Sequence, residues 1–156
     1  MNDTAPLTDD RDPADVIDAA IGHALGLAAT WTAWDGTPLP VEDRVYTPHK
    51  AIRRIADHLV DHLAEMEARL AGHAPIPDAW HASMITTAAD LAPFTDDDLD
   101  EARSRLTRLG QVWRVRLGAL DPRQLDESPG EGWSFRQLAF HLGSTYYADA
   151  VGRITV

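Results

Sequence analysis

The sequence predicts an all-α fold, a four-helix bundle whose helices run up, down, down and up, with a long crossover between the second and third. Apolar residues recur at steps of three and four along four separate segments, the pattern of helices with one buried face. Each segment begins with a helix-capping signal. Alternation of β-branched and polar residues is nowhere evident, so we expect no sheet.

Length and composition favour a single globular domain. The chain has 156 residues, of which 44% are hydrophobic, and such a domain buries enough surface to fold without disulfides or a structural metal. It has no cysteine, which excludes disulfides, cysteine-ligated zinc and a protein thiol nucleophile. We expect the domain to span residues 12–156. Residues 1–11, acidic and proline-containing, are predicted to be a disordered lead-in.

Charge and hydropathy exclude several classes of partner. The formal net charge is −11, a field that repels phosphate backbones, so we expect no nucleic-acid partner. No run of about 18 apolar residues is seen, and the lead-in lacks the apolar segment of a secretory signal. We therefore expect no membrane partner and a cytoplasmic location.

The first two helices are predicted from proline at the first helical position. Asp12-Pro13 opens the first helix, which stops before Gly36, and Thr47-Pro48 opens the second, which Gly72 ends. The apolar stripe of the second helix is unbroken and comprises Ile52, Ile55, Leu59, Leu63, Met66 and Leu70.

The third helix is predicted to begin at Thr95 and the fourth at Ser134, where Gln137 completes a capping box. The 23 residues from Gly72 to Phe94 form a connection too long to join antiparallel neighbours, and they contain three prolines. A connection of this length implies a crossover, with a short helix expected near residues 80–90.

Three histidines fall at matching places on the second and fourth helices. His58 and His62 are one turn apart at the edge of the apolar arc, and His141 has the same angular offset on its own helix as His58. Three neutral imidazoles from two helices are a donor set for Zn²⁺, Ni²⁺ or Fe²⁺. The alternative is that they hydrogen-bond to nearby carboxylates such as Asp57, Asp61 or Glu65.

The segment from Trp133 to Leu142 reads W-S-F-R-Q-L-A-F-H-L and resembles the W-S-x-R-x-L-x-x-H-h motif of the DinB/YfiT-like superfamily. The likeness extends over about residues 12–153 through the four helices and the crossover. Many members of that superfamily hold a divalent metal with one histidine of the second helix and an H-x-x-x-H pair of the fourth. Some actinobacterial relatives are transferases or isomerases that use the thiol mycothiol, and others act on amide-like bonds.

The resemblance assigns His58 as the second-helix ligand and His141 as the first of the fourth-helix pair. Thr145 stands where the second histidine of that pair is expected. His62, the counterpart of Thr145 on the second helix, is the predicted replacement ligand.

Further residues are predicted around this site and on the surface. Trp133, His81 and Tyr146 are the expected substrate-binding residues; Trp133 would either line the pocket or act as a hydrophobic staple at the helix start. A second apolar stripe on the fourth helix favours a homodimer interface, unless the lead-in or the crossover covers it. It consists of Phe140, Tyr147 and Val151.

Two functions remain open on sequence grounds. One is a metal-dependent transferase, isomerase or hydrolase that acts on a small molecule, with any low-molecular-weight thiol supplied from outside the chain. The other is a metal-free small-molecule-binding or regulatory dimer that has lost the metal triad, which Thr145 favours.

Overall fold

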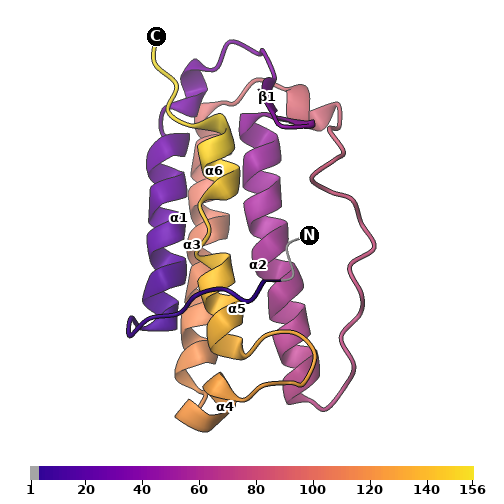
Figure 1. Ribbon diagram of the computed structural model, residues 1–156. Coiled ribbons are helices and arrows are strands. Elements are labelled where there is room, and N and C mark those ends of the chain that lie inside the picture. The colour runs from indigo at the N-terminus through magenta and orange to yellow at the C-terminus, as the bar shows by residue number, and fades with distance from the viewer. Residues whose placement is uncertain (1–3) are drawn as a thin grey trace.

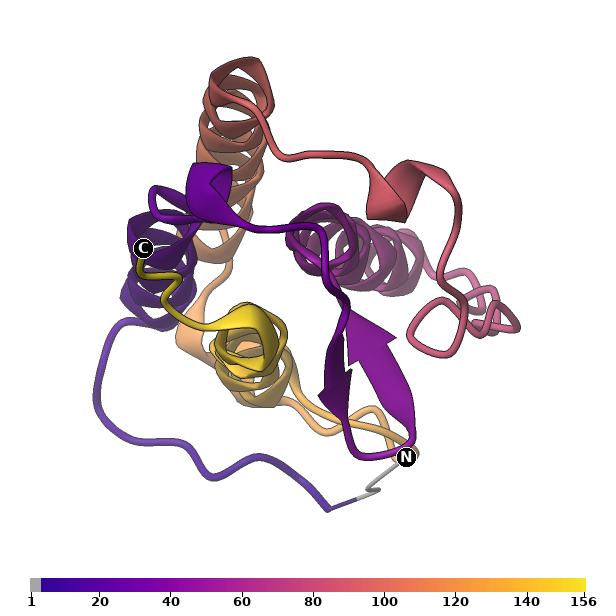
Figure 2. The same ribbon diagram turned by 90° about the horizontal axis from the view of Figure 1, so that it is seen from above.

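The protein is mainly α-helical in the computed structural model, which describes residues 4–156. Figure 1 shows the long helical segments lying side by side. These segments are α1 (Pro13–Ala28), α2 (Pro48–Leu70), α3 (Asp96–Gly118) and the consecutive pair α5 (Phe135–Leu142) and α6 (Tyr146–Val151). Viewed along their length, they surround one core, in which α1 contacts α3 and α5, and α2 contacts α3 and α6 (Figure 2).

The predicted helix starts are confirmed, with the expected capping bonds. The Asp12 carboxylate accepts a hydrogen bond from the Ala14 N–H, and the Thr47 hydroxyl accepts one from the Lys50 N–H. Thr95 and Ser134 each form a reciprocal capping box with the residue three positions on. These side chains satisfy backbone donors that the first turn of a helix leaves free.

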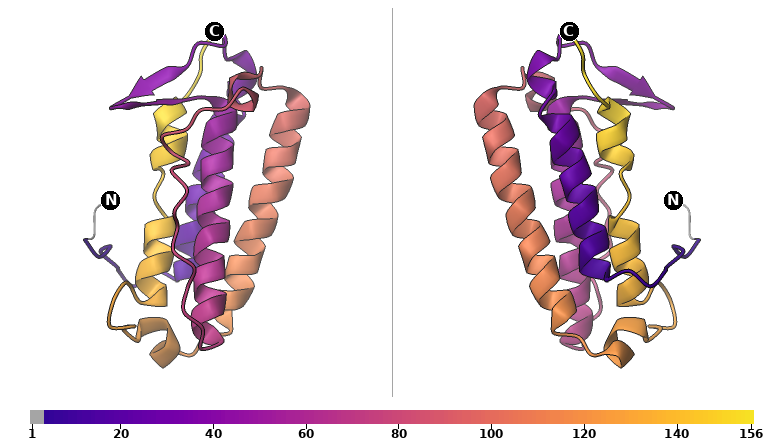
Figure 3. Two further views of the ribbon diagram at one scale, coloured as in Figure 1. Left: turned by 90° about the vertical axis from the view of Figure 1, so that its right-hand side faces the viewer. Right: turned by 90° about the vertical axis from the view of Figure 1, so that its left-hand side faces the viewer.

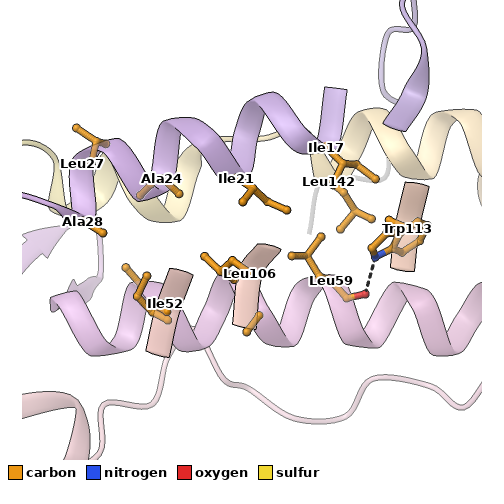
Figure 4. Packing of buried hydrophobic residues seen from close by; sticks show 14 of the residues in the cluster. Ile17, Ile21, Ala24, Leu27, Ala28, Ile52, Leu59, Leu106, Trp113 and Leu142 are labelled. Carbon is orange, nitrogen blue, oxygen red and sulfur yellow. Dashed lines mark hydrogen bonds between the residues drawn. The ribbon is translucent and has the colours of Figure 1, made fainter. Parts of the chain in front are cut away.

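The core cluster consists of apolar side chains, and a hydrogen bond from Trp113 crosses it. The residues drawn in Figure 4 come from α1, α2, α3 and α5, and the Trp113 indole N–H donates to the Leu59 carbonyl at 3.1 Å. Trp113 is fully buried, so this bond satisfies its one polar group. It also ties α3 to the middle of α2, just beyond His58.

A small antiparallel hairpin precedes α2. The expectation that the chain contains no sheet is therefore wrong for this segment. Strand β1 (Leu39–Val41) pairs with β2 (Arg44–Tyr46), and the chain turns through Glu42 at a φ of 58°. Each strand has only three residues, too few for an alternating pattern to be recognised. The hairpin closes one end of the molecule and contacts α6.

The predicted fourth helix is broken into two, and a short helix precedes it. α5 ends at Leu142 and α6 begins at Tyr146. A methyl group added to Gly143 at the break would lie 2.4 Å from Cγ1 of Val16 on α1, so the close approach of α1 requires glycine there. The additional helix, α4 (Pro122–Asp126), lies between α3 and α5.

The connection from Gly72 to Phe94, here called the strap, runs beside α2 in both views of Figure 3. It holds a single 3₁₀ turn, η2 (Ala89–Leu91), instead of the short helix expected near residues 80–90. Its second half is bound to the start of α2, where the Arg53 guanidinium donates to the buried Asp90 carboxylate at 2.7 and 3.1 Å. The buried Lys50 ammonium donates to Thr86 Oγ1 at 3.0 Å. These bonds hold the second half of the strap against the start of α2.

Two further regions bear on the expected partners. The stretch Pro13–Ala33 is long and apolar enough to cross a membrane, by length and composition alone, a test that core helices of soluble proteins also pass. The absence of a membrane partner therefore stays a prediction. Of the lead-in, residues 1–3 lie outside the described residues, and residues 4–11 contain neither helix nor strand.

Candidate metal centre

The three predicted histidines come together in the middle of the molecule. His58 and His62 lie on consecutive turns of α2, and His141 lies in the last turn of α5. One ring nitrogen of each lies within 4.8 Å of those of the other two, and all three side chains are half-buried. The group could hold a metal ion. The structure therefore confirms that the three histidines converge, as their angular offsets on the helices predicted.

The closest pair is His58 and His141. Their Nε2 atoms are 2.7 Å apart, so one neutral ring donates its N–H to the other. A tetrahedral ion 2.0–2.1 Å from each nitrogen needs the nitrogens about 3.3 Å apart. The two rings would therefore have to separate by only about half an ångström, which small side-chain rotations supply.

His62 is oriented by a carboxylate. Its Nδ1 lies 3.1 Å from Glu65 Oε1, and Arg69 donates to the other oxygen of that carboxylate at 3.2 Å. A histidine that donates Nδ1–H to a carboxylate presents a basic Nε2, which is the usual arrangement around protein-bound metals. The predicted alternative, a histidine bound to Glu65, and the predicted metal ligand are therefore compatible.

Burial keeps two of the imidazoles neutral. Loss of solvation lowers the pKa of His58 to about 2 and that of His141 to about 4, and the neighbouring His62 adds to both shifts. The hydrogen bond from His62 lowers the pKa of the Glu65 carboxyl below its usual value. A metal ligand must be a neutral imidazole, so the environment keeps His58 and His141 in the form that binds metal.

Two aromatic rings flank the histidines. The Trp133 ring lies 4.7 Å from that of His141, so Trp133 borders the site as predicted. Tyr147 lies 5.7 Å from the His58 ring, and its hydroxyl accepts a hydrogen bond from Arg54 at 3.0 Å. The spacing of Phe140, Tyr147 and Val151 predicted a surface stripe for Tyr147. No helical spacing from His141 could have placed it here, because α5 ends between the two residues.

A small cavity lies beside His58. Its volume is about 20 Å³, enough for about one water molecule, and α1, α2 and the break between α5 and α6 enclose it. Polar groups reach it only from the α2 and α5–α6 sides. These are His58, Ser144, Thr145 and Tyr147.

Thr145 is engaged away from the histidines. Its hydroxyl donates to Asp149 at 2.6 Å, and the other oxygen of that carboxylate lies 2.7 Å from Nε2 of His23 on α1. The sequence offered no partner for His23, because Asp149 is 126 residues away along the chain. Asp149 therefore joins α1 to α6, and the Thr145 hydroxyl is bonded to Asp149 instead of to a histidine.

Two predicted substrate-binding residues lie elsewhere. Tyr146 is 39% exposed, and its ring packs on those of Tyr46 and Tyr147. It follows Leu138 and Leu142 at four-residue steps, a spacing that predicts a core position, and that prediction is wrong. His81 is exposed on the strap, where only its backbone carbonyl is bonded, to the N–H groups of Met84 and Ile85. Neither side chain is brought to the site.

The proposed dimer stripe is largely covered by the chain itself. Val151 is buried at 8% exposure, Tyr147 faces His58, and the Arg11 guanidinium lies 5.5 Å from the centre of the Phe140 ring. The lead-in thus covers part of the stripe, one of the alternatives weighed from the sequence. The homodimer stays a prediction, because Phe140, Tyr147 and Val151 do not form a continuous exposed apolar surface.

The chain was compared with protein-family models, with curated proteins and with solved structures, and none of the three comparisons found a match. The resemblance to the DinB/YfiT-like superfamily therefore stays a prediction from the sequence, carried by the segment from Trp133 to Leu142.

Proposed function

We propose that the protein is a divalent-metal-dependent enzyme of the DinB/YfiT-like type, a single-domain up-down-down-up four-helix bundle acting on a small molecule in the cytoplasm. The observation that carries this proposal is the convergence of three imidazole rings, one nitrogen of each lying within 4.8 Å of the others, with His62 oriented by Glu65. Neutral imidazoles suit Zn²⁺, Ni²⁺ or Fe²⁺. The net charge of −11 makes a nucleic-acid substrate unfavourable.

The chemistry follows from three protein ligands. Such a site leaves a coordination position for a water or thiol, whose pKa the ion lowers when bound. Because the chain has no cysteine, a thiol nucleophile would come from an external low-molecular-weight compound. His58, His62 and His141 would hold the ion, Glu65 would orient His62, and Trp133 and Tyr147 would border the substrate. The reaction class is thiol transfer or isomerisation, or hydrolysis.

Metal analysis of untagged protein tests this proposal. Protein stripped with chelator and then dialysed against Zn²⁺, Ni²⁺ or Fe²⁺ should retain about one equivalent of at least one ion. The matched control is the double variant His23→Ala/His81→Ala, which removes two histidines that lie outside the cluster and should bind the same amount. Retention below a tenth of an equivalent of every ion would contradict the proposal.

A second candidate is a metal-free small-molecule-binding or regulatory dimer. It is favoured by the engagement of Thr145 with Asp149 and by the direct hydrogen bond between His58 and His141, which satisfies the two rings without an ion. It predicts a melting temperature unaffected by chelator or added metal, and a dimer in sedimentation analysis. A chelator-sensitive melting temperature would favour the enzyme, because a ligand that binds only the folded state stabilises it.

A further inference from the structure

A polar stripe runs along α2 at four-residue intervals, on the face that meets α5 and α6. It consists of Lys50, Arg54, His58 and His62. Residues four positions apart are neighbours on a helix surface, so each side chain adjoins the next. His58 and His62 belong to the candidate metal centre. Lys50 and Arg54 are buried cations, 0% and 8% exposed, in a protein with a net charge of −11.

Arg54 has fewer partners than a buried guanidinium requires. Its Nε donates to Ser83 Oγ on the strap and one Nη2 hydrogen is donated to the Tyr147 hydroxyl, both at 3.0 Å. The nearest carboxylate oxygen, on the half-exposed Asp57, is 4.0 Å from Nη1, beyond hydrogen-bond distance. Among the described residues three of the five N–H groups therefore have no protein acceptor, and Nη1, which carries two of them, is not fully enclosed and can reach a ligand or solvent. Arginine stays charged in proteins, and a buried charge normally has an ionic partner.

The other neighbouring residues supply no closer ionic partner than Asp57. Arg53 has the buried Asp90 carboxylate, but Lys50 is bonded to a carbonyl and a hydroxyl, and Tyr147 offers Arg54 only a phenol. Tyr46, whose ring lies 6.2 Å from that of Tyr147, has a fully buried hydroxyl without a hydrogen-bond partner. The surroundings of Arg54 are thus rich in cations and hydroxyl groups and poor in carboxylates.

Tyr147 links Arg54 to the histidines. Its ring is 5.7 Å from that of His58, and its ring centre is 5.0 Å from Cζ of Arg54. Arg54 also precedes His58 by one turn of α2, so a ligand bound to the guanidinium lies next to the metal-ligating rings. A planar carboxylate matches the parallel N–H groups of a guanidinium, which hold it with two hydrogen bonds.

We propose that Arg54 and Tyr147 bind a carboxylate group of the substrate, and that the rest of the substrate extends along α2 to the histidine cluster. The substrate class is a small organic acid. The carboxylate site is a property of the metal-free chain, while its use to position a reacting group rests on the proposed function. The two parts are therefore tested separately.

The first experiment titrates metal-free, ¹⁵N-labelled protein with sodium acetate at constant ionic strength and follows the arginine Nε–H signals by NMR. The Arg54 signal should shift and saturate. Arg54→Gln should weaken acetate binding at least tenfold, measured on backbone signals of α2. Arg54→Lys keeps the positive charge but lacks the planar guanidinium, so it should lose part of the acetate affinity. This variant replaces Arg54→Gln in the test if the glutamine variant does not fold.

Three controls separate the carboxylate site from other effects. Ser83→Ala removes the bond between Arg54 and the strap but leaves the guanidinium, so acetate affinity should stay within twofold. Arg108→Gln removes an exposed arginine of α3 and should also have no effect. Asp57→Asn removes the competing carboxylate and should strengthen binding. Equal acetate binding by wild type and Arg54→Gln, or binding of inorganic phosphate without acetate, would overturn the proposal.

The second experiment tests the link to the metal. Protein loaded with Co²⁺ is titrated with ω-mercaptocarboxylates of increasing chain length, and thiolate binding is read from the sulfur-to-cobalt absorption band. At one chain length the acid should bind at least tenfold more tightly than the equally long mercaptoamide, and Arg54→Gln should abolish that preference. A preference for the acid that persists in Arg54→Gln would contradict the positioning role. Failure to bind Co²⁺ would refute the metal centre and leave the acetate result to decide the carboxylate site.

Discussion

Helix α2 and the α5–α6 segment carry similar sequences up to His58 and His141, since residues 52–59 read I-R-R-I-A-D-H-L and residues 135–142 read F-R-Q-L-A-F-H-L, yet they differ in what lies four residues later. α2 continues to Leu70, so His62 follows His58 on the same face and joins the cluster. α5 ends one residue after His141, and the chain turns before Thr145. Continuity of the helix, not similarity of the sequence, decides which residue becomes the third member of the cluster.

The largest expected effect separates these two positions. His62→Ala should weaken metal binding more than about 100-fold, because loss of a direct ligand exceeds the 10–100-fold cost typical of a lost outer partner. Thr145→Ala should leave metal affinity within threefold, since Thr145 is bonded to Asp149. Competition with a chromogenic chelator measures both. Comparable losses in the two variants would show that Thr145 belongs to the centre.

A smaller effect is expected from the carboxylate behind His62. Glu65→Gln keeps the shape of the side chain but weakens the bond to Nδ1, so metal affinity should fall by about 10–100-fold. The same chelator competition measures it, and Glu67→Gln, on the same helix outside the cluster, is the matched control. Full affinity in Glu65→Gln would mean that His62 needs no orientation.

The pH dependence of stability tests the histidine pair that bridges the two segments. The pKa of His58 is lowered to about 2 and that of His141 to about 4 by burial, while both are near 6.5 in the unfolded chain. Above pH 6.5 neither state binds protons there; below it only the unfolded state does, so stability is lost as pH falls from 6.5 towards 4.

Metal-free protein should accordingly lose about 4 kcal/mol of unfolding free energy between pH 7 and pH 5 through these two residues, about 2 kcal/mol from each. Urea denaturation at each pH measures the loss. The double variant His58→Gln/His141→Gln provides the baseline from all other groups. A parallel pH profile for the variant and the wild type would show that the pair is not held neutral.

The break between α5 and α6 gives the last prediction. Gly143→Ala places a methyl group against the stiff, buried Val16, and overpacking of this kind costs about 1–3 kcal/mol. Gly118→Ala at the end of α3 meets nothing within 4 Å and should be neutral or slightly stabilising. Thermal unfolding compares the two. Equal stability would mean that the close approach of α1 does not fix the break.

The metal cluster and the carboxylate site differ in how far the sequence could predict them. His58, His62 and His141 were predictable because helical geometry fixes angular offsets and the aligned segments repeat them. Tyr147 and Arg54 were not joined by any pattern, since 93 residues separate them. Tyr146 was misplaced because the prediction extended one helical period across the break.

The amino-acid sequence by itself determined where the helices begin, which faces are apolar and where the histidines fall, because capping and periodicity act within a few residues of each other. Only the tertiary structure decided the rest: the interruption at Gly143, forced by contact with Val16, the pairing of Thr145 and His23 with Asp149, and the strap bound to the buried cations of α2. Those features depend on close contacts between segments far apart in the chain. Local sequence patterns do not predict which distant residues will come into contact.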